Sequence, residues 1–145
     1  MRELTDTETG RLEECLRELA CHHNEVSAHF RGLYPRRPVP ETLAAFAEDL
    51  RSGRSRIAAV EEGDRILGFC KTDLVGTEGT VAYLVVLREA RGKGYGGLLM
   101  DWALDALRRD GACSIEVKVV DGNDAVGFYE KYGFRINARI LRMNV

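Results

Sequence analysis

The feature that most constrains this chain is an apolar run that leads into a glycine-rich turn and then an amphipathic helix. Residues 81–87 (VAYLVVL) are continuously apolar, as is typical of a strand buried on both faces. The turn 91–97 (RGKGYGG) follows closely, and a helical apolar pattern then continues to Gly111. Residues 114–119 alternate between polar and apolar, which indicates a half-buried strand. This order predicts two parallel strands joined by a right-handed helical crossover.

The region before this unit shows helical periodicity first and strand patterns later. Thr5 and Glu8 form a capping-box pattern, from which we predict a helix to about Phe30. The proline-rich segment 31–40 interrupts it, and a second helix is expected from Pro40 to a stop at Gly53. The remaining predicted elements are a hairpin of 57–60 and 66–72 about the turn 62–64, a short helix over about 123–132 and a closing strand over 134–145.

These elements predict an α+β fold with a mixed, mostly antiparallel central sheet, one parallel strand–helix–strand unit and flanking helices. The length of 145 residues fits one domain, so we expect residues 1–145 to form a single unit. Free edges of such a sheet would allow a homodimer.

Charge and hydropathy exclude several classes of protein. The 21 basic and 23 acidic residues nearly balance, so we expect neither nucleic-acid nor membrane binding. No apolar run approaches the ~20 residues that span a bilayer, and the first residues lack the apolar core of a signal peptide. We therefore expect a cytoplasmic protein.

The four cysteines are dispersed and form no C-x-x-C pair, which indicates free, mostly buried thiols. Cys21, His22 and His23 lack the spacing and the second half-site of a zinc centre, so no metal is expected.

The glycine-rich turn is the candidate binding site. Its glycines, Gly92, Gly94, Gly96 and Gly97, are more than a tight turn requires, and free N–H groups at a helix start favour an anion such as phosphate. The pattern G-x-G-x-x-G also fits dinucleotide binding. That fold places the motif after its first strand and an acidic residue at a strand end about 20 positions later. Here two helices and a hairpin precede the motif, and the corresponding residue, Glu116, lies in mid-strand. The lack of Gly-Lys-Ser/Thr excludes a P-loop.

Two segments resemble the GNAT superfamily of N-acetyltransferases. Residues 86–97 (VLREARGKGYGG) are similar to its acyl-CoA signature, with Arg91, Gly94 and Gly96 at the characteristic positions. Residues 123–134 (NDAVGFYEKYGF) resemble its C-terminal motif. Many members have one more residue between the asparagine and the alanine, so the equivalence of Asn123 is left open.

The resemblance implies the acyl-CoA N-acyltransferase fold with acetyl-CoA as co-substrate. In that fold the two parallel strands splay apart at their carboxyl ends, the pantetheine arm bonds to strand backbone and the diphosphate sits on the glycine turn. Mapped onto this chain, the implied cofactor-binding residues are Leu84, Val85, Val86, Arg91, Gly92, Lys93, Gly94, Tyr95, Gly96, Gly97, Asn123 and Phe128.

The resemblance also places Tyr129 at the family's general-acid position, and a phenol with a pKa near ~10 is protonated at neutral pH. The general base is not identified. Glu78 is one candidate, although its position in a turn favours a solvated carboxylate. His22, His23 and Asn24 either line an acceptor pocket or lie on a helix surface. Nothing marks Cys70 or Cys113 as a thiolate nucleophile.

The predicted function is transfer of an acetyl group from acetyl-CoA to a primary amine by direct attack on the thioester. Two alternatives are a non-catalytic acyl-CoA-binding or regulatory module and a structural domain whose glycine turn binds nothing. The identity of the acceptor, a small molecule or a peptide, stays open.

Overall fold

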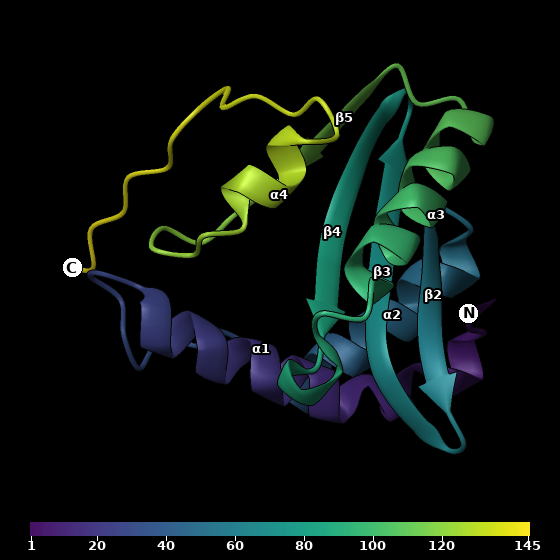
Figure 1. Cartoon of the computed structure of the whole chain (residues 1–145), viewed down its shortest axis with the longest axis horizontal. Coiled ribbons are helices and arrows are strands. Elements are labelled where there is room, and N and C mark those ends of the chain that lie inside the picture. The colour runs from purple at the N-terminus through teal and green to yellow at the C-terminus, as the bar shows by residue number, and fades with distance from the viewer.

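The computed structural model describes residues 1–145 and contains a five-stranded sheet in the order β1-β2-β3-β4-β5 (Figure 1). Neighbouring strands are antiparallel up to β4, and β4 and β5 are parallel. The predicted mixed, mostly antiparallel sheet with one parallel unit is therefore confirmed. The strands are β1 (Arg2–Glu3), β2 (Ser55–Glu62), β3 (Arg65–Val75), β4 (Glu78–Val86) and β5 (Ser114–Val117).

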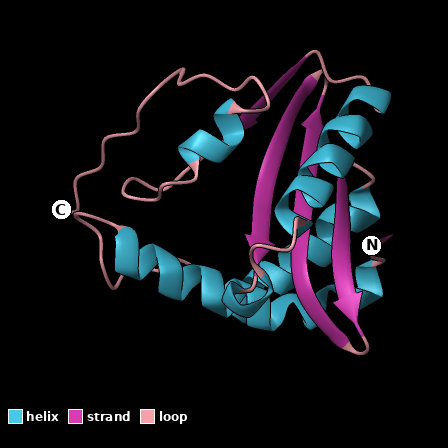
Figure 2. Cartoon of the chain, in the orientation of Figure 1, coloured by secondary structure: helices cyan, strands magenta, loops and turns pink.

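Helices cover both faces of the sheet (Figure 2). The helix α2 packs behind it, and α3 crosses in front and connects β4 to β5. None of the helices has the combination of length and apolar character that crossing a bilayer requires. The α-helices are α1 (Glu13–Val26), α2 (Val39–Ser52), α3 (Tyr95–Arg109) and α4 (Val126–Glu130), and two 3-10 helices are η1 (Asp6–Leu12) and η2 (Arg88–Ala90).

The core lies between β2, β3 and β4 and the two covering helices. On the α2 face, Phe46 packs edge-on against Tyr83 and Phe69, whose ring centroids lie 4.9 and 6.2 Å away. On the other face, α3 buries Leu99 and Met100, because its apolar residues recur at helical spacing. Burial of this continuous apolar surface is what holds the sheet and both helices together.

One charged side chain lies within this core. The Lys71 ammonium is buried and lies 3.0 Å from a carboxylate oxygen of Asp49 on α2, and it also pairs with Asp73 on its own strand. The Ser55 hydroxyl donates to Asp73 at 2.6 Å. Because an unpaired buried charge is costly, this network ties α2 to the edge of the apolar core.

The N-terminal helix differs from its prediction. The Thr5 capping box is present but begins η1, and α1 follows it and ends at Val26 instead of near Phe30. The helix ends there because Ser27 is extended, and the Asn24 side chain bonds to the loop instead: its oxygen accepts from Gly32 and Tyr34 N–H groups, both at 2.9 Å.

The C-terminal region differs more strongly. The strand β5 ends at Val117, α4 is shorter than the predicted 123–132, and the predicted closing strand over 134–145 is wrong for the single chain. A strand exists only where its backbone groups find a neighbouring strand, and residues 135–145 make no backbone hydrogen bond. The prediction of mostly buried thiols holds for Cys15 and Cys70 but not for the other two.

Candidate functional site

The site begins at the part of β4 that has β3 on one side and no strand on the other. The register with β5 runs from Glu78 to Val81, whereas β3 pairs with β4 as far as Val86. Figure 2 shows no strand on the other side of the lower half of β4. The backbone of 82–86 therefore has a free edge, as the predicted splay of the two parallel strands requires.

The glycine turn follows at the carboxyl end of this free edge. Gly92 and Gly94 have φ angles of +80° and +85°, a left-handed conformation that side chains other than glycine rarely adopt. The six backbone N–H groups of 92–97 have no acceptor within the protein, and Gly94 is the N-cap of α3. Free donors at the positive end of a helix dipole form a site for an anion.

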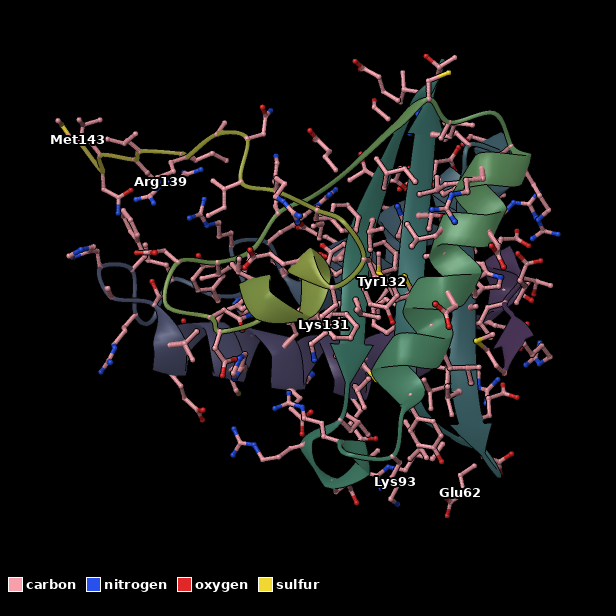
Figure 3. All side chains as sticks on the ribbon, turned by 45° about the horizontal axis from the view of Figure 1, so that its top comes forward. Glu62, Lys93, Lys131, Tyr132, Arg139 and Met143 are labelled. Atoms are coloured by element: carbon pink, nitrogen blue, oxygen red, sulfur yellow. The ribbon has the colours of Figure 1, made fainter.

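Arg91 and Lys93 project from the turn in different directions. The Arg91 Nε donates to the Val86 carbonyl at 3.1 Å, so this side chain folds back over the end of β4. Lys93 lines a pocket of about 180 Å³ with Glu62 and Glu89 (Figure 3). The structure thus places Arg91 against the free edge of β4 and Lys93 beside carboxylates on the other side.

The second family motif, residues 123–134, packs against the glycine turn and the start of α3. A Cβ at Gly97 would lie 3.3 Å from the Tyr132 hydroxyl, and one at Gly96 would lie 3.8 Å from the Phe128 ring. The absence of a side chain at Gly97 therefore makes room for Tyr132. Phe128 on α4 and Tyr132 just after it therefore cover the first turn of α3, and the two motifs form one site.

Tyr129 lies at the centre of this aromatic group and is buried. Its ring packs edge-on against Phe128 and Phe134, with centroids 5.3 and 6.0 Å away. Burial, with a smaller contribution from the Cys70 thiol, raises the pKa of Tyr129 to about 12. Cys70 pairs with Leu84 in the sheet, so the phenol lies near the stretch of β4 with the free edge. Tyr129 is therefore a protonated donor at neutral pH.

Asn123 stabilises the turn before α4. Its side-chain oxygen accepts from the Ala125 N–H at 3.2 Å, and its own N–H bonds to the Val120 carbonyl at 2.9 Å. The structure thus places Asn123 in a local turn, with its amide NH₂ group as the remaining donor.

The base candidate Glu78 and the pocket candidates His23 and Asn24 make no contact with the turn. Glu78 is exposed at the opposite end of β4, about 26 Å from Val86 at ~3.3 Å per residue. His23 packs edge-on against Tyr34, with ring centroids 5.1 Å apart, and burial lowers its pKa. Asn24 holds the loop between α1 and α2 through backbone contacts. None of the three is brought together with the glycine turn by a contact.

The sequence reasoning missed the contact between the loop after β5 and the end of α1. Gly122 has a φ angle of +90°, and a Cβ there would lie 2.0 Å from the Val26 carbonyl oxygen. Only glycine allows this approach. Its position in an Asp-Gly-Asn turn was the available signal, but the partner segment is distant in sequence.

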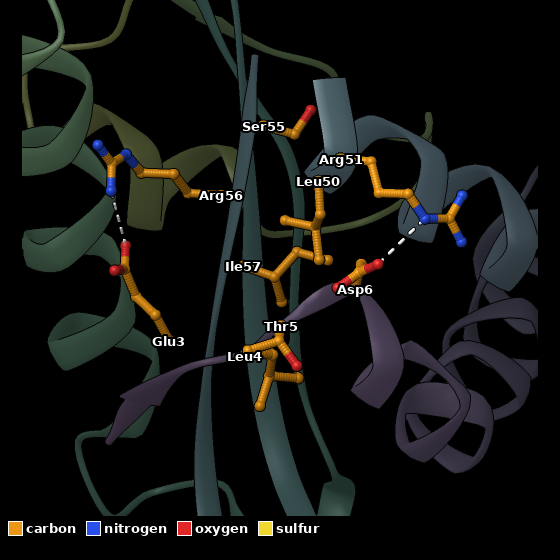
Figure 4. Close-up of a pocket in the computed structure, with 9 residues that line it drawn as sticks. All are labelled: Glu3, Leu4, Thr5, Asp6, Leu50, Arg51, Ser55, Arg56 and Ile57. Carbon is orange, nitrogen blue, oxygen red and sulfur yellow. Dashed lines mark hydrogen bonds and ion pairs between the residues drawn. The ribbon is translucent and has the colours of Figure 1, made fainter. Parts of the chain in front are cut away.

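A larger pocket of about 300 Å³ lies at the other edge of the sheet (Figure 4). Its arginines are already paired, Arg51 with Asp6 at 3.0 Å and Arg56 with Glu3 at 3.4 Å. Such neutralised charges leave little attraction for an anion, and the pocket shares no residue with the glycine turn. The lining residues are Glu3, Leu4, Thr5, Asp6, Leu50, Arg51, Ser55, Arg56 and Ile57.

Comparison with known proteins agrees with this geometry. Residues 16–134 match the Acetyltransferase (GNAT) family, and this chain belongs to that family. A relative from Schizosaccharomyces pombe, N-alpha-acetyltransferase 30, is 36% identical over 87 residues, which cover 56% of this chain and 58% of the relative. The match therefore spans little more than half of that relative.

Solved structures share the fold at low sequence identity. A transcriptional regulator from Bacillus halodurans has a TM-score of 0.74 and 21% identity, with 99% of this chain and 97% of that chain covered. A predicted acetyltransferase from Clostridium acetobutylicum, crystallised with acetyl-CoA, has a TM-score of 0.75 and 16% identity, with 99% and 94% covered. These likenesses support the acyl-CoA N-acyltransferase fold.

Proposed function

We propose that this protein transfers an acetyl group from acetyl-CoA to a primary amine by direct attack of the amine on the thioester. The observation that supports the proposal is that three features lie next to one another in the structure. The free edge of β4 over 82–86 leads into six unpartnered N–H groups over 92–97, and the buried Tyr129, whose hydroxyl stays protonated, packs against Phe128 beside this turn.

The free groups of the site fit the two halves of coenzyme A. The N–H groups of 92–97 would hold the diphosphate, since several donors and a helix dipole favour a doubly charged anion. The amide-containing pantetheine arm would bond to the open backbone edge around Leu84, Val85 and Val86 as an added strand does. Phe128 would lie against the cofactor at the start of α3.

Acetyl-CoA, when bound, supplies an activated acyl thioester. A backbone N–H at the free edge near Val86 would polarise the acyl oxygen. As the nitrogen–carbon bond forms and the carbon–sulfur bond breaks, the Tyr129 hydroxyl would donate a proton to the departing sulfur. The amine releases its proton to solvent and the Tyr129 phenolate takes one up from solvent, so protons and charges balance over the cycle.

The acceptor is a primary amine, and the α-amine of a peptide is the first to test. An α-amine has a pKa of about 7.7–8.0 and is partly neutral at pH 7, whereas a lysine with a pKa near ~10.4 needs a base. No contact brings a base candidate to the turn. The similarity to a protein named N-alpha-acetyltransferase points to the same acceptor class.

Acetyl-CoA consumption, followed as release of free thiol, tests this function across an amine panel. The panel contains a peptide with a free N-terminus, an N-terminally blocked peptide with one lysine, a polyamine and an aminoglycoside. Turnover of at least one amine is expected. Thermal stabilisation by acetyl-CoA without thiol release for any amine would instead establish the non-catalytic binding module, and no stabilisation would exclude acyl-CoA binding altogether.

The Tyr129→Phe variant tests the role of the hydroxyl. Loss of proton donation to the sulfur should lower kcat by about 10²-fold or more and leave the dissociation constant of acetyl-CoA unchanged. Tyr132→Phe is the matched control, because it removes a phenol hydroxyl only three residues further along the chain, in the turn after α4, and should keep kcat. An unchanged kcat in Tyr129→Phe would remove Tyr129 from the chemistry.

A further inference from the structure

The loop between α1 and α2, residues 27–38, carries three arginines and no acidic residue, and we call it the arginine loop. Arg31, Arg36 and Arg37 are all exposed. Arg31 and Arg36 form no ion pair, and Arg37 contacts one carboxylate, that of the exposed Glu41, at 3.8 Å. So long a contact between exposed groups contributes little energy. The loop is therefore locally positive in a chain whose net charge is -2.

Arginines around β1 and η1 are neutralised by carboxylates instead. Arg2 and Arg11 each pair with both Glu8 and Glu61, at distances from 2.6 to 3.2 Å. These arginines have their donors occupied within the fold. The arginine loop differs, because its guanidinium groups keep N–H donors for a partner outside the chain.

The arginine loop is held in place by side chains at the end of α1. The Asn24 amide donates to the Tyr34 carbonyl at 2.8 Å and accepts from the Gly32 and Tyr34 N–H groups. The His23 ring packs edge-on against Tyr34, and the Arg36 guanidinium lies over the same ring, 5.4 Å from its centroid. A guanidinium stacked on a ring keeps its in-plane N–H donors available. The loop therefore presents its charges from a defined position, as recognition requires.

The arginine loop begins on the side of the sheet where β4 has its free edge. Figure 1 shows α1 extending past β4 on this side. Glu18 and Glu25 of α1 both bind Arg88, which lies just after β4. One carboxylate accepts from the Arg88 backbone N–H at 2.9 Å, and the other pairs with its guanidinium at 3.0 Å. The end of α1, from which the loop starts, is therefore fixed beside the carboxyl end of β4.

The other end of the loop approaches Tyr83, which belongs to the free edge. The Tyr83 ring packs edge-on against Phe46 of α2, with centroids 4.9 Å apart, and is only half-buried. Burial raises the pKa of Tyr83, and the positive charges of Lys71 and Arg37 oppose that rise. Arg37 is therefore close enough to the Tyr83 hydroxyl for its charge to act there.

These positions determine what an acceptor would meet. The glycine turn, α3 and α4 lie on the side that we assign to coenzyme A, so the acceptor amine would reach the edge of 82–86 from the side of α1 and α2. The chain attached to that amine would then continue over the arginine loop. Guanidinium groups bind carboxylates through paired N–H donors, and a positive surface attracts acidic molecules from a distance. An acceptor with carboxylates close to its amine therefore fits this surface, and a cationic one is repelled.

We propose that the arginine loop selects peptide acceptors that carry carboxylate side chains in the first residues after the α-amine, and that Arg36 and Arg37 are its specificity residues. The inference rests on the proposed acetyl transfer and adds to it the charge of the acceptor. Arg31 contributes to the same positive surface, although its Nε already donates to the Ser27 carbonyl at 3.1 Å.

Three peptides of equal length test the preference. Each begins with alanine and continues with two aspartates, two asparagines or two arginines, followed by the same neutral residues and a blocked carboxyl end. The aspartate peptide should have a KM about tenfold lower than the asparagine peptide at similar kcat, because only the aspartates form two exposed charge pairs. The arginine peptide should be the poorest acceptor. Calorimetric titration with the three peptides should give the same order without turnover.

Variants of the loop test which residues are responsible. Arg36→Gln/Arg37→Gln should raise the KM for the aspartate peptide by about tenfold and leave kcat and the dissociation constant of acetyl-CoA unchanged. Arg108→Gln/Arg109→Gln is the matched control, because it removes two exposed arginines at the end of α3 and changes the net charge equally. Circular dichroism shows whether each variant is folded.

Charge reversal separates recognition from a purely structural role. Arg36→Glu/Arg37→Glu should make the arginine peptide the best acceptor, which a loop that only connects two helices would not do. Equal KM values for the aspartate and asparagine peptides, an unchanged order in the charge-reversed variant, or turnover of a polyamine but of no peptide would overturn this inference alone. Turnover of no amine would overturn the proposed acetyl transfer, and the inference with it.

Discussion

The N-terminal three-quarters of the molecule and the part that follows α3 are built differently. In the first region, β2, β3 and β4 pair along their length, and α2 and α3 bury an apolar core on both faces. In the second, β5 pairs over only four registered residues, α4 has 5 residues and residues 135–145 make no backbone hydrogen bond.

This difference distinguishes the paired and buried core of β2, β3, β4, α2 and α3 from the segments that form the candidate site. Every group that we assign to acyl-CoA binding lies where the regular pairing stops: at the free edge of β4, at the glycine turn and on α4. A ligand that binds as an added strand and on free N–H groups needs an edge that the protein leaves open. We therefore expect substitutions in the paired and buried core to change stability, and substitutions at the β4 edge, in the glycine turn and on α4 to change binding.

The largest expected effect is a loss of stability from a substitution in the buried core. Phe69 is fully buried and packs against Phe46 and Tyr83. Phe69→Ala should lower the free energy of unfolding by about 3–5 kcal/mol, because it removes a large side chain and leaves a cavity. Urea unfolding measures this. Phe128→Ala, at a half-buried position over the turn, should cost less stability than Phe69→Ala and weaken acetyl-CoA binding more. A greater loss of stability in Phe128→Ala, or weaker binding in Phe69→Ala, would contradict the distinction between the core and the site.

The next effect is at the glycine turn. Gly94 has a φ angle of +85°, so Gly94→Ala should cost about 1–2 kcal/mol of backbone strain and move the N–H groups at the start of α3. We expect the dissociation constant of acetyl-CoA, measured by calorimetry, to rise at least about tenfold, or ~1.4 kcal/mol. Gly10→Ala is the control, since Gly10 has no positive φ and open space around it. Equal binding by both variants would contradict the role of the turn.

A smaller effect tests the packing between the two motifs. The methyl group of Gly97→Ala would lie 3.3 Å from the Tyr132 hydroxyl, so the variant should lose about 1 kcal/mol of stability through crowding. Removing the hydroxyl in Tyr132→Phe should restore it. A double-mutant cycle on thermal unfolding measures the coupling, and simple additivity would show that α4 does not pack on this turn in solution.

The smallest effect concerns pH. Burial, and then the charge of His22, lowers the pKa of His23 below its ordinary value near ~6.5. The neutral form is favoured in the folded state, so its contribution to stability is complete above pH 6.5 and is lost as the pH falls through the folded pKa. His23→Gln should reduce the fall in Tm between pH 7 and pH 5, while His29→Gln, at an exposed site, should not. Identical slopes would contradict the assignment.

Several parts of the fold followed from local patterns. The second helix ends at Gly53, which has a φ angle of +79°, and the hairpin turns at Gly63, as glycine at these positions predicts. The parallel β4–α3–β5 unit followed from strand, glycine turn and helix in that order. These features depend on residues near one another in the chain, so periodicity and turn chemistry suffice.

The larger failures involve partners that are distant in the sequence. The pattern of residues 135–140 is that of a strand, but a strand also needs a free edge within reach, and the local sequence does not say where that edge lies. The same reason applies to Gly122, whose contact with Val26 joins segments far apart in the sequence. Lys71 lies in an otherwise apolar part of β3, and its partner Asp49 lies on α2, far away in the sequence.

The sequence by itself determined the family resemblance, the mixed sheet and the segment with the free N–H groups, because the glycine turn and the helix start that create them are adjacent in the chain. The tertiary structure decided that β5 leaves β4 after Val81, that Tyr132 lies against Gly97 and that Tyr129 is buried near Cys70. Those arrangements arise from packing between elements, and packing depends on shapes and distances that no local pattern contains.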